Sequence, residues 1–239
     1  MKITKQAKKP YEGLKLSVPP IQTAESLRNQ AYAILKKAIS ETEIYNGPDE
    51  VQLDEKALTL ALGVSRTPIR EAMTRLEQEG FLRTVPRKGI YIVRKTKAEI
   101  IEMIQMWAVL EGLSARLACL NASDEDIACL RNLFDCLHND TPSEHMDEYS
   151  DANIAFHQKI VALGGSKLIS DAITNIFIHV RAMRKMTLFQ SDRAARSIND
   201  HMQIIEALEN RNPELAEKLV RQHSFDLAEF VLKNCNFLE

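Results

Sequence analysis

Three histidines and one amide are spaced so that they could meet at a single metal site. His201 and His223 are 22 residues apart, and the midpoint falls on Asn212, where an Asn-Pro pair would end one helix and begin the next. Two helices folded back at that point hold both imidazoles at the same height. Asn153 and His157 are four residues apart and share one face of another predicted helix. Imidazole suits Zn²⁺, Ni²⁺ or Cu²⁺, although a single buried histidine is more often a hydrogen-bonded core residue.

A second group of side chains could read DNA. Apolar residues recur at helical spacing from residue 69 to 76, while Arg66, Arg70 and Thr74 are four apart on the opposite face. Ser65 is predicted to cap this helix, and Gly80 to end it. A helix of this length with two arginines on its exposed amino-terminal half fits a DNA major groove. The alternative is an ordinary amphipathic helix with two surface arginines.

A basic hairpin is predicted directly after this helix. Residues 82–85 and 90–93 have strand character and are joined by Pro86-Arg87-Lys88-Gly89, so the tip carries two cations. Such a tip can lie along a phosphate backbone. Gly63 separates the helix from a shorter one before it, at a turn that often requires positive φ. Helix, turn, helix and basic hairpin together describe a winged helix-turn-helix.

The charge distribution divides the chain into two parts. Residues 1–97 hold 18 Lys and Arg against 11 Asp and Glu, a balance of +7, whereas the remainder has a balance of −9. A basic amino-terminal part suits a polyanion, and an acidic carboxy-terminal part must have another partner. With 239 residues and 45% hydrophobic content, the chain can bury two modest cores.

The sequence also predicts a cellular location. No run approaches the roughly 20 apolar residues that span a bilayer, and the amino terminus lacks an apolar signal core, so a cytoplasmic protein is expected. The cysteines form no C-x-x-C pair and are expected to be free buried thiols of a reducing compartment. They are Cys119, Cys129, Cys136 and Cys235.

The predicted fold is mainly α, with three segments. Residues 1–20 are a flexible basic tail, 21–95 a winged helix-turn-helix, and 96–239 an all-helical bundle. In the second segment we predict a helix over 24–41, a short strand over 51–53 and a helix capped by Asp54 that ends at Leu62. Thr96 and Glu99 form a predicted capping box that starts the bundle. The six predicted bundle helices cover residues 100–120, 123–137, 143–163, 167–189, 191–210 and 213–233.

The segment from about residue 27 to 93 resembles the DNA-binding domain of GntR-type bacterial transcription regulators. Three stretches carry the match: LGVSRTPIREA from Leu62, RLEQEGFL from Arg75, and PRKG from Pro86. Lys56 stands where the family commonly has an arginine on the DNA backbone, so a phosphate contact without a planar fork is expected. The resemblance and the helix pattern together give a set of candidate contacts. Those to base edges are Arg66 and Arg70, with Ser65 and Thr67 beside them, and those to the backbone are Lys56, Arg87, Lys88 and Gly89.

The helical half resembles the effector-binding domain, called FCD, of the FadR group of these regulators, in its six-helix, VanR-like form. The matching stretches are LE at Leu110, ARLA at Ala115, AFH at Ala155, DH at Asp200, and the late histidine at position 223. The resemblance implies a metal held by an aspartate, a histidine four residues later and two further histidines. His157, His201 and His223 match, but Asn153 replaces the aspartate. An amide is a neutral and weaker ligand.

This departure leaves two hypotheses for the site. In the first, a Zn²⁺ or Ni²⁺ ion is present and an anionic effector completes its charge. In the second, no metal is bound and the histidines hydrogen-bond the effector directly. Trp107 also stands where the family often has a carboxylate-binding arginine, so Arg181 or Arg184 is expected to supply the cation. A pocket lined partly by Trp107 would favour an apolar or aromatic acid.

The resemblance implies a ligand-responsive, sequence-specific transcription regulator, most often a repressor released by a small organic acid. A homodimer is expected because two-fold operators require two-fold proteins. Two alternatives belong to other classes. One is a metal-dependent hydrolase, which three histidines around a metal would permit, although no carboxylate is evident near them as a general base. The other is an architectural DNA-binding protein without an effector. We expect no enzymatic activity.

Overall fold

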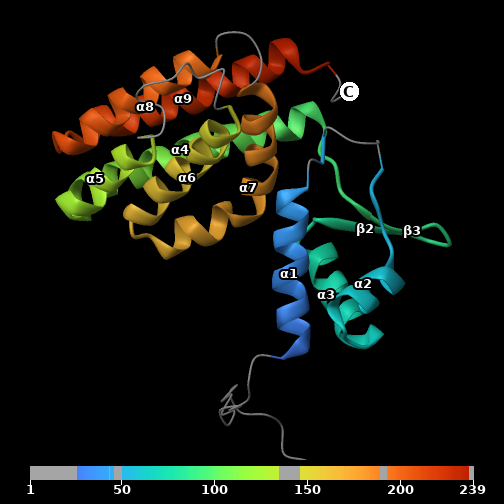
Figure 1. Cartoon of the computed structure of the whole chain (residues 1–239). Helices are drawn as coiled ribbons and strands as arrows, with labels where there is room; N and C mark the ends of the chain where they lie inside the picture. Colours follow the sequence, from blue (N-terminus) through green and yellow to red (C-terminus); the bar gives the residue numbers. More distant parts are fainter. Residues whose placement is uncertain (1–25, 43, 46–49, 135–145, 189–192, 237–239) are drawn as a thin grey trace, which may run out of the picture.

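The computed structural model describes residues 26–42, 44–45, 50–134, 146–188 and 193–236. In Figure 1 a helical bundle lies beside a smaller lobe that carries a short β-sheet, and the helix α7 stands between them. The fold is mainly helical, as predicted. The predicted basic tail, residues 1–20, lies outside the described residues.

The smaller lobe begins with three helices whose ends follow from local chemistry. They are α1 (Leu27–Glu41), α2 (Glu55–Leu62) and α3 (Arg66–Gln78). Asp54 caps α2, as predicted, by accepting hydrogen bonds from two backbone N–H groups. Gly63 ends α2 at a φ of 64°, which confirms the predicted left-handed turn. Ser65 occupies the N-cap position of α3, but its side chain makes no capping hydrogen bond, so that part of the prediction is wrong.

Three short strands form the wing. They are β1 (Gln52–Leu53), β2 (Leu82–Val85) and β3 (Gly89–Ile92), paired antiparallel in the order β1-β3-β2. Gln52 lies opposite Tyr91, and Val85 lies opposite Gly89. The predicted hairpin and its pairing with the strand before α2 are therefore confirmed. In Figure 1 the hairpin extends away from the bundle.

Six helices make up the described part of the other half. The capping box of Thr96 and Glu99 starts the first of them, as predicted. The second ends five residues earlier than expected, and the predicted start of the third at residue 143 lies outside the described residues. The helices are α4 (Lys97–Asn121), α5 (Asp124–Asn132), α6 (Met146–Leu163), α7 (Lys167–Leu188), α8 (Arg193–Glu209) and α9 (Pro213–Asn234).

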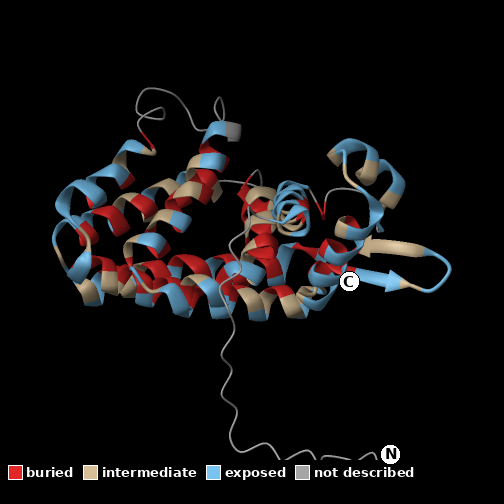
Figure 2. Cartoon of the chain, turned by 90° about the horizontal axis from the view of Figure 1, so that it is seen from below, coloured by how far each residue is buried: buried red, intermediate tan, exposed pale blue. Residues whose placement is uncertain are grey.

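Two hydrophobic cores hold the molecule together. One lies inside the bundle among α4, α5, α6, α8 and α9. The other continues from the winged lobe into the bundle and joins residues of α1 and α3 to residues of α4, α7 and α9. Figure 2 shows the buried residues along the inner faces of the helices. Apolar packing therefore crosses the boundary between the two lobes.

Three further details bear on the predictions. The helix α4 is long and apolar enough to cross a membrane by length and composition, but half of its apolar window is buried inside the bundle, as in the core helix of a folded domain. Cys119 and Cys235 are free and buried, as predicted. Cys129 is free but exposed, so the prediction of a buried thiol is wrong for this residue. Cys136 lies outside the described residues. Arg75, which lies well round α3 from Arg66, pairs with Glu79 at 3.1 Å.

Candidate metal centre and nucleic-acid interface

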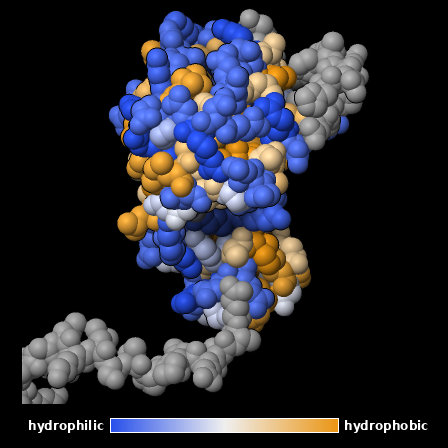
Figure 3. Space-filling model, turned by 90° about the vertical axis from the view of Figure 1, so that its left-hand side faces the viewer, coloured by the Kyte–Doolittle hydropathy of each residue, from blue (hydrophilic) through white to orange (hydrophobic). Residues whose placement is uncertain are grey.

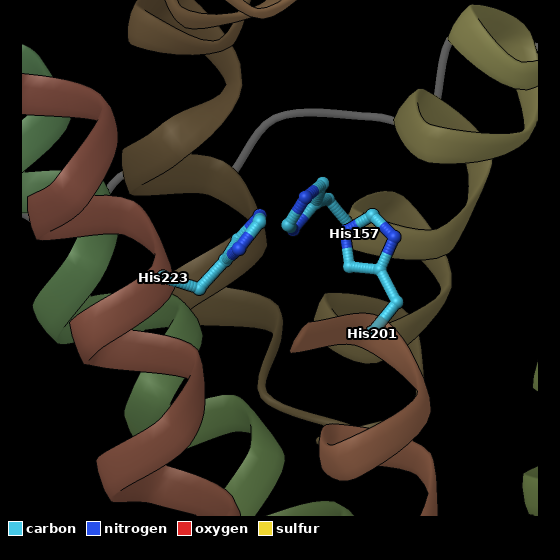
Figure 4. Close-up of side chains that lie close together, drawn as sticks. All are labelled: His157, His201 and His223. Carbon is cyan, nitrogen blue, oxygen red and sulfur yellow. The ribbon is translucent and has the colours of Figure 1, made fainter. Parts of the chain in front are cut away.

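The three predicted histidines converge inside the bundle. His157 comes from α6, His201 from α8 and His223 from α9, and all three are buried. One ring nitrogen from each lies within 4.8 Å of the others. Figure 4 shows the rings pointing toward one another. The side chain of Asn212 caps α9. The turn between α8 and α9 therefore lies midway between His201 and His223, as their spacing predicted.

Carboxylates orient two of these rings through contacts with their outward Nδ1 atoms. Glu111, fully buried on α4, lies with its Oε1 2.5 Å from Nδ1 of His157. Oδ2 of Asp200 lies 3.0 Å from Nδ1 of His223. A carboxylate at Nδ1 keeps the proton on that nitrogen and leaves Nε2 as the free lone pair. The Tyr149 hydroxyl lies 3.4 Å from Nδ1 of His201.

The inward-facing atoms fit a metal ion. Nε2 of His157, Nε2 of His201 and Oδ1 of Asn153 are buried and have no hydrogen-bond partner. Nδ2 of Asn153 donates to Ser197 Oγ at 3.4 Å, which leaves the amide oxygen available. Buried polar atoms without partners are costly, and a Zn²⁺ or Ni²⁺ ion would satisfy them together. Three of the four predicted ligands therefore have unpartnered donor atoms for such an ion, whereas Nε2 of the fourth, His223, lies 3.2 Å from Nη1 of Arg184.

Burial keeps the imidazoles neutral, which is the form that binds metals. It holds the pKa of His157 and of His201 well below the usual value for histidine. Burial also lowers the pKa of His223 to about 4, although the hydrogen bond that its Nδ1 donates to Asp200 opposes this shift. At neutral pH the three rings therefore do not need to lose a proton before they ligate an ion.

Arg184 adds a buried cation to the same site. It lies on α7, and its Nη1 is 3.2 Å from Nε2 of His223 while its Nη2 donates to Ser224 Oγ at 2.8 Å. Its Nη2 is 3.7 Å from Glu111. Burial lowers the pKa of Arg184 to about 10, so the guanidinium remains charged at neutral pH. A divalent ion beside this cation would leave positive charge that an anionic ligand could balance.

The other two residues expected to bind the effector lie elsewhere. Arg181 donates from Nη1 to the carbonyl oxygen of Ser40 in α1 and so contacts the winged lobe. Trp107 is buried, packs against Phe177 with ring centroids 5.2 Å apart, and donates from Nε1 to Glu111 at 2.6 Å. Trp107 therefore touches the histidine cluster through Glu111.

A pocket of about 790 Å³ opens between α8 and α9 next to the cluster. His223 and Asp200 are among its lining residues, so it gives a route toward the rings. Arg193 also lines it and places its guanidinium 4.8 Å from the ring centre of Phe230. The pocket carries both signs of charge, with Lys233 among the cations. Its volume suits a small organic molecule.

Sequence reasoning missed the carboxylates around the histidines. No general base was evident near them, yet the structure places Glu111 and Asp200 in direct contact with two of the rings. Both carboxylates bind the outward Nδ1 atoms, so they orient the rings. Asp200 precedes His201, and Glu111 belongs to the Leu-Glu pair that carried the resemblance. Their positions in these motifs were the available signal.

The predicted DNA-reading residues form an exposed basic surface on α2, α3 and the wing. The base-edge candidates lie on the first turns of α3, where Arg66 and Arg70 both reach toward Glu55 of α2. This carboxylate was not predicted. Ser65 and Thr67 lie beside the arginines and are exposed, and so is Lys56 on α2. The candidates on one face of α3 are therefore accessible to a DNA duplex.

The turn at the tip of the wing contains two residues with positive φ. Arg87 has a φ of 63° and Gly89 a φ of 131°, both in the left-handed range. A Cβ on Gly89 would lie 2.4 Å from Nε2 of Gln52, which itself donates to the Lys88 carbonyl oxygen at 2.9 Å. The turn therefore presents the exposed side chains of Arg87 and Lys88 at its outer end. This arrangement suits contacts to phosphates.

Comparisons with known families and proteins agree with this arrangement. The family model described as bacterial regulatory proteins, gntR family, matches residues 27–92, and the FCD domain model matches residues 102–225. The Nta operon transcriptional regulator of Aminobacter aminovorans is 31% identical over 173 residues, which is 72% of this chain and 80% of that protein. The HTH-type transcriptional repressor RspR of Escherichia coli is 23% identical over 88% of this chain and 91% of that protein.

Solved structures share the fold at lower sequence identity. Escherichia coli McbR/YncC superimposes with a TM-score of 0.72 at 21% identity, covering 89% of this chain and 100% of that chain. A regulator from Rhodococcus sp. RHA1, described as a putative transcriptional regulator GntR, gives a TM-score of 0.68 at 21% identity, covering 87% and 98%. The winged helix-turn-helix, the FCD domain and the relatives together show that this chain belongs to the GntR family of bacterial transcription regulators and carries an FCD effector-binding domain.

Proposed function

We propose that this regulator senses a small organic acid at a metal ion held by Asn153, His157, His201 and His223. The observation that carries the proposal is the set of unpartnered inward atoms beside a buried cation, Arg184. The ion would be Zn²⁺ or Ni²⁺, which polarises a bound carboxylate, and Arg184 would share its charge. Elemental analysis of the purified protein, before and after a chelator, tests this. A stoichiometric metal lost with the chelator is expected, and its absence would favour direct hydrogen bonding to the effector.

The DNA contacts form the second part of the proposal. Residues 21–95 would bind a two-fold operator with α3 in the major groove, with Arg66 and Arg70 on base edges. Lys56 and the wing tip would contact phosphates. The remaining residues, 96–239, would bind the effector and pair the two protomers. Repression in the cytoplasm, relieved by the effector, is the proposed sense of control.

An exposed apolar stripe on α4 supports a homodimer. Met106, Val109, Leu113 and Leu120 follow one another at intervals that keep them on one side of the helix, and all four are exposed. Beside them Arg116 donates to Glu214 at 2.8 Å, so the rim holds both signs of charge. An isologous contact needs such a self-complementary surface. On the face shown in Figure 3, apolar surface is broken into patches among hydrophilic residues.

The substitution Leu113→Glu is expected to break this dimer, because it places an unpaired charge at the centre of the apolar stripe. Sedimentation should then show a monomer at concentrations where the unchanged protein is dimeric. Leu168→Glu on α7 is the matched control, since Leu168 is also exposed. A Leu113→Glu protein that sediments as a dimer would place the interface elsewhere.

We also propose that α7 carries the state of the effector site to the DNA-binding domain. One end of its contacts is Arg184, within the cluster. At the other end, Nδ1 of His179 and the hydroxyl of Tyr45 share a buried hydrogen bond of 2.7 Å, and Asn175 accepts an exposed hydrogen bond from Lys36 at 3.2 Å. Burial lowers the pKa of His179 to about 4 and raises that of Tyr45 to about 12, so both are neutral and the bond persists at physiological pH.

Tyr45→Phe is expected to weaken this coupling and leave both sites intact. Removing the hydroxyl leaves Nδ1 of His179 without its partner, at a cost of about 1–3 kcal/mol in the free energy of unfolding. Hydrogen exchange of the α3 amides should respond to Zn²⁺ in the unchanged protein and less in the variant. Equal responses in the two proteins would show that the signal travels by another path.

A further inference from the structure

Glu55 lies within ion-pair distance of both predicted reading arginines, Arg66 and Arg70. It is the first residue of α2, and both its carboxylate oxygens accept from Nε of Arg70, at 2.9 and 3.0 Å. Nε of Arg66 lies 3.9 Å from the same carboxylate. The side chain of Glu55 is 24% exposed, whereas those of Arg66 and Arg70 are 58% and 64% exposed. A mostly buried carboxylate therefore pairs with two guanidinium groups that are mostly exposed to solvent.

The contribution of Glu55 to the stability of the fold does not explain why a carboxylate lies on this surface. An exposed ion pair adds little to the free energy of unfolding, and on a phosphate-binding surface a carboxylate repels the partner. The geometry gives a different reason. Glu55 occupies Nε of Arg70, and within the described residues no hydrogen bond engages the two terminal nitrogens at the far edge of this guanidinium. Two parallel N–H donors at that edge match O6 and N7 of guanine.

We propose that Glu55 is a positioning residue that makes DNA binding sequence-specific, by holding Arg70 and Arg66 toward base edges and away from phosphates. This rests on the proposed entry of α3 into the major groove. A free arginine can turn to the backbone and bind any sequence, and the carboxylate opposes that. Glu55 therefore lowers affinity for random DNA and raises it for the operator.

The test uses Glu55→Gln in the full-length protein, which keeps the shape of the side chain and removes its charge. The probes are the duplex that the unchanged protein enriches from a random library and a scrambled duplex of the same composition. We expect the variant to bind the enriched duplex about tenfold more weakly and the scrambled duplex more tightly. The salt dependence on the enriched duplex should steepen by about one ion for each arginine that moves to a phosphate.

Two controls isolate the positioning role. Glu41→Gln removes the same charge from an exposed pair with Lys37 in α1 and should leave the ratio of the two affinities unchanged. In an Arg70→Ala background, Glu55→Gln should lose most of its effect on that ratio. Tighter binding of both duplexes by the same factor would show repulsion alone and overturn the proposal, and so would equal weakening of both.

Failure of the proposed DNA reading by α3 would give a different result from failure of the proposal for Glu55. If the unchanged protein enriches no sequence, or if Arg70→Ala leaves the affinity ratio intact, then α3 does not read bases and the proposal for Glu55 falls with it. If Arg70→Ala lowers the ratio and Glu55→Gln does not, α3 reads bases but Glu55 does not position its arginines.

Discussion

Saturation with Zn²⁺ or Ni²⁺ is expected to raise the unfolding temperature of the helical domain and to give one bound ion per chain. A ligand at 100 times its Kd stabilises the folded state by about 2.7 kcal/mol. For a domain of this size that is a shift of about 5–10 °C. His201→Ala should abolish most of the shift, because His201 supplies one of the buried, unpartnered nitrogens. Differential scanning calorimetry with and without metal measures it.

The matched control is His179→Ala. His179 is also buried, but it lies outside the cluster and bonds Tyr45 instead. Its loss should lower the unfolding temperature of the protein without metal and leave the metal-induced shift in place. Asn153→Asp should enlarge that shift, because a carboxylate at this position balances part of the ion's charge. A shift that survives His201→Ala would place the ion outside the cluster.

Arg70→Ala is expected to reduce specific DNA binding by about 1–3 kcal/mol, the value of one bidentate contact to a base pair. Lys88→Ala, at the exposed tip of the wing, should weaken enriched and scrambled duplexes by the same factor, because phosphates carry no sequence. The two affinities, measured by fluorescence anisotropy at fixed salt, separate the roles.

The salt series provides a second comparison for the same variants. Lys88→Ala should reduce the slope of log affinity against log salt by about one on both duplexes, because one phosphate contact is lost. Arg70→Ala should change the slope much less on the enriched duplex. If both variants lose affinity for enriched and scrambled DNA equally, the assignment of Arg70 to a base edge is wrong.

Local sequence was sufficient to predict most of the secondary structure. Asp54, Gly63, the Thr96 capping box and Asn212 each act through backbone groups within a few residues, so their effects are visible in one dimension. Periodicity gave the helices for the same reason. Ser65 was the exception, since it stands at the N-cap but makes no capping bond.

The histidine cluster was also within reach of sequence, because a short turn at Asn212 fixes the relative height of two antiparallel helices. The carboxylates around it were not. Glu111 comes from α4, and its contact with His157 joins residues 46 apart in the chain. No periodic pattern encodes which buried faces of distant helices meet, since packing of the whole bundle determines it.

The sequence by itself determined a basic winged helix-turn-helix, an acidic helical bundle and the candidate ligands His157, His201 and His223. It could do so because helical period, turn chemistry and charge are local properties. Tertiary structure decided which cation joins the cluster: it buries Arg184 beside His223 and sends Arg181 to the carbonyl of Ser40. Three residues along a helix are enough to turn a side chain toward a different neighbour, and only the packed position of α7 selects between them.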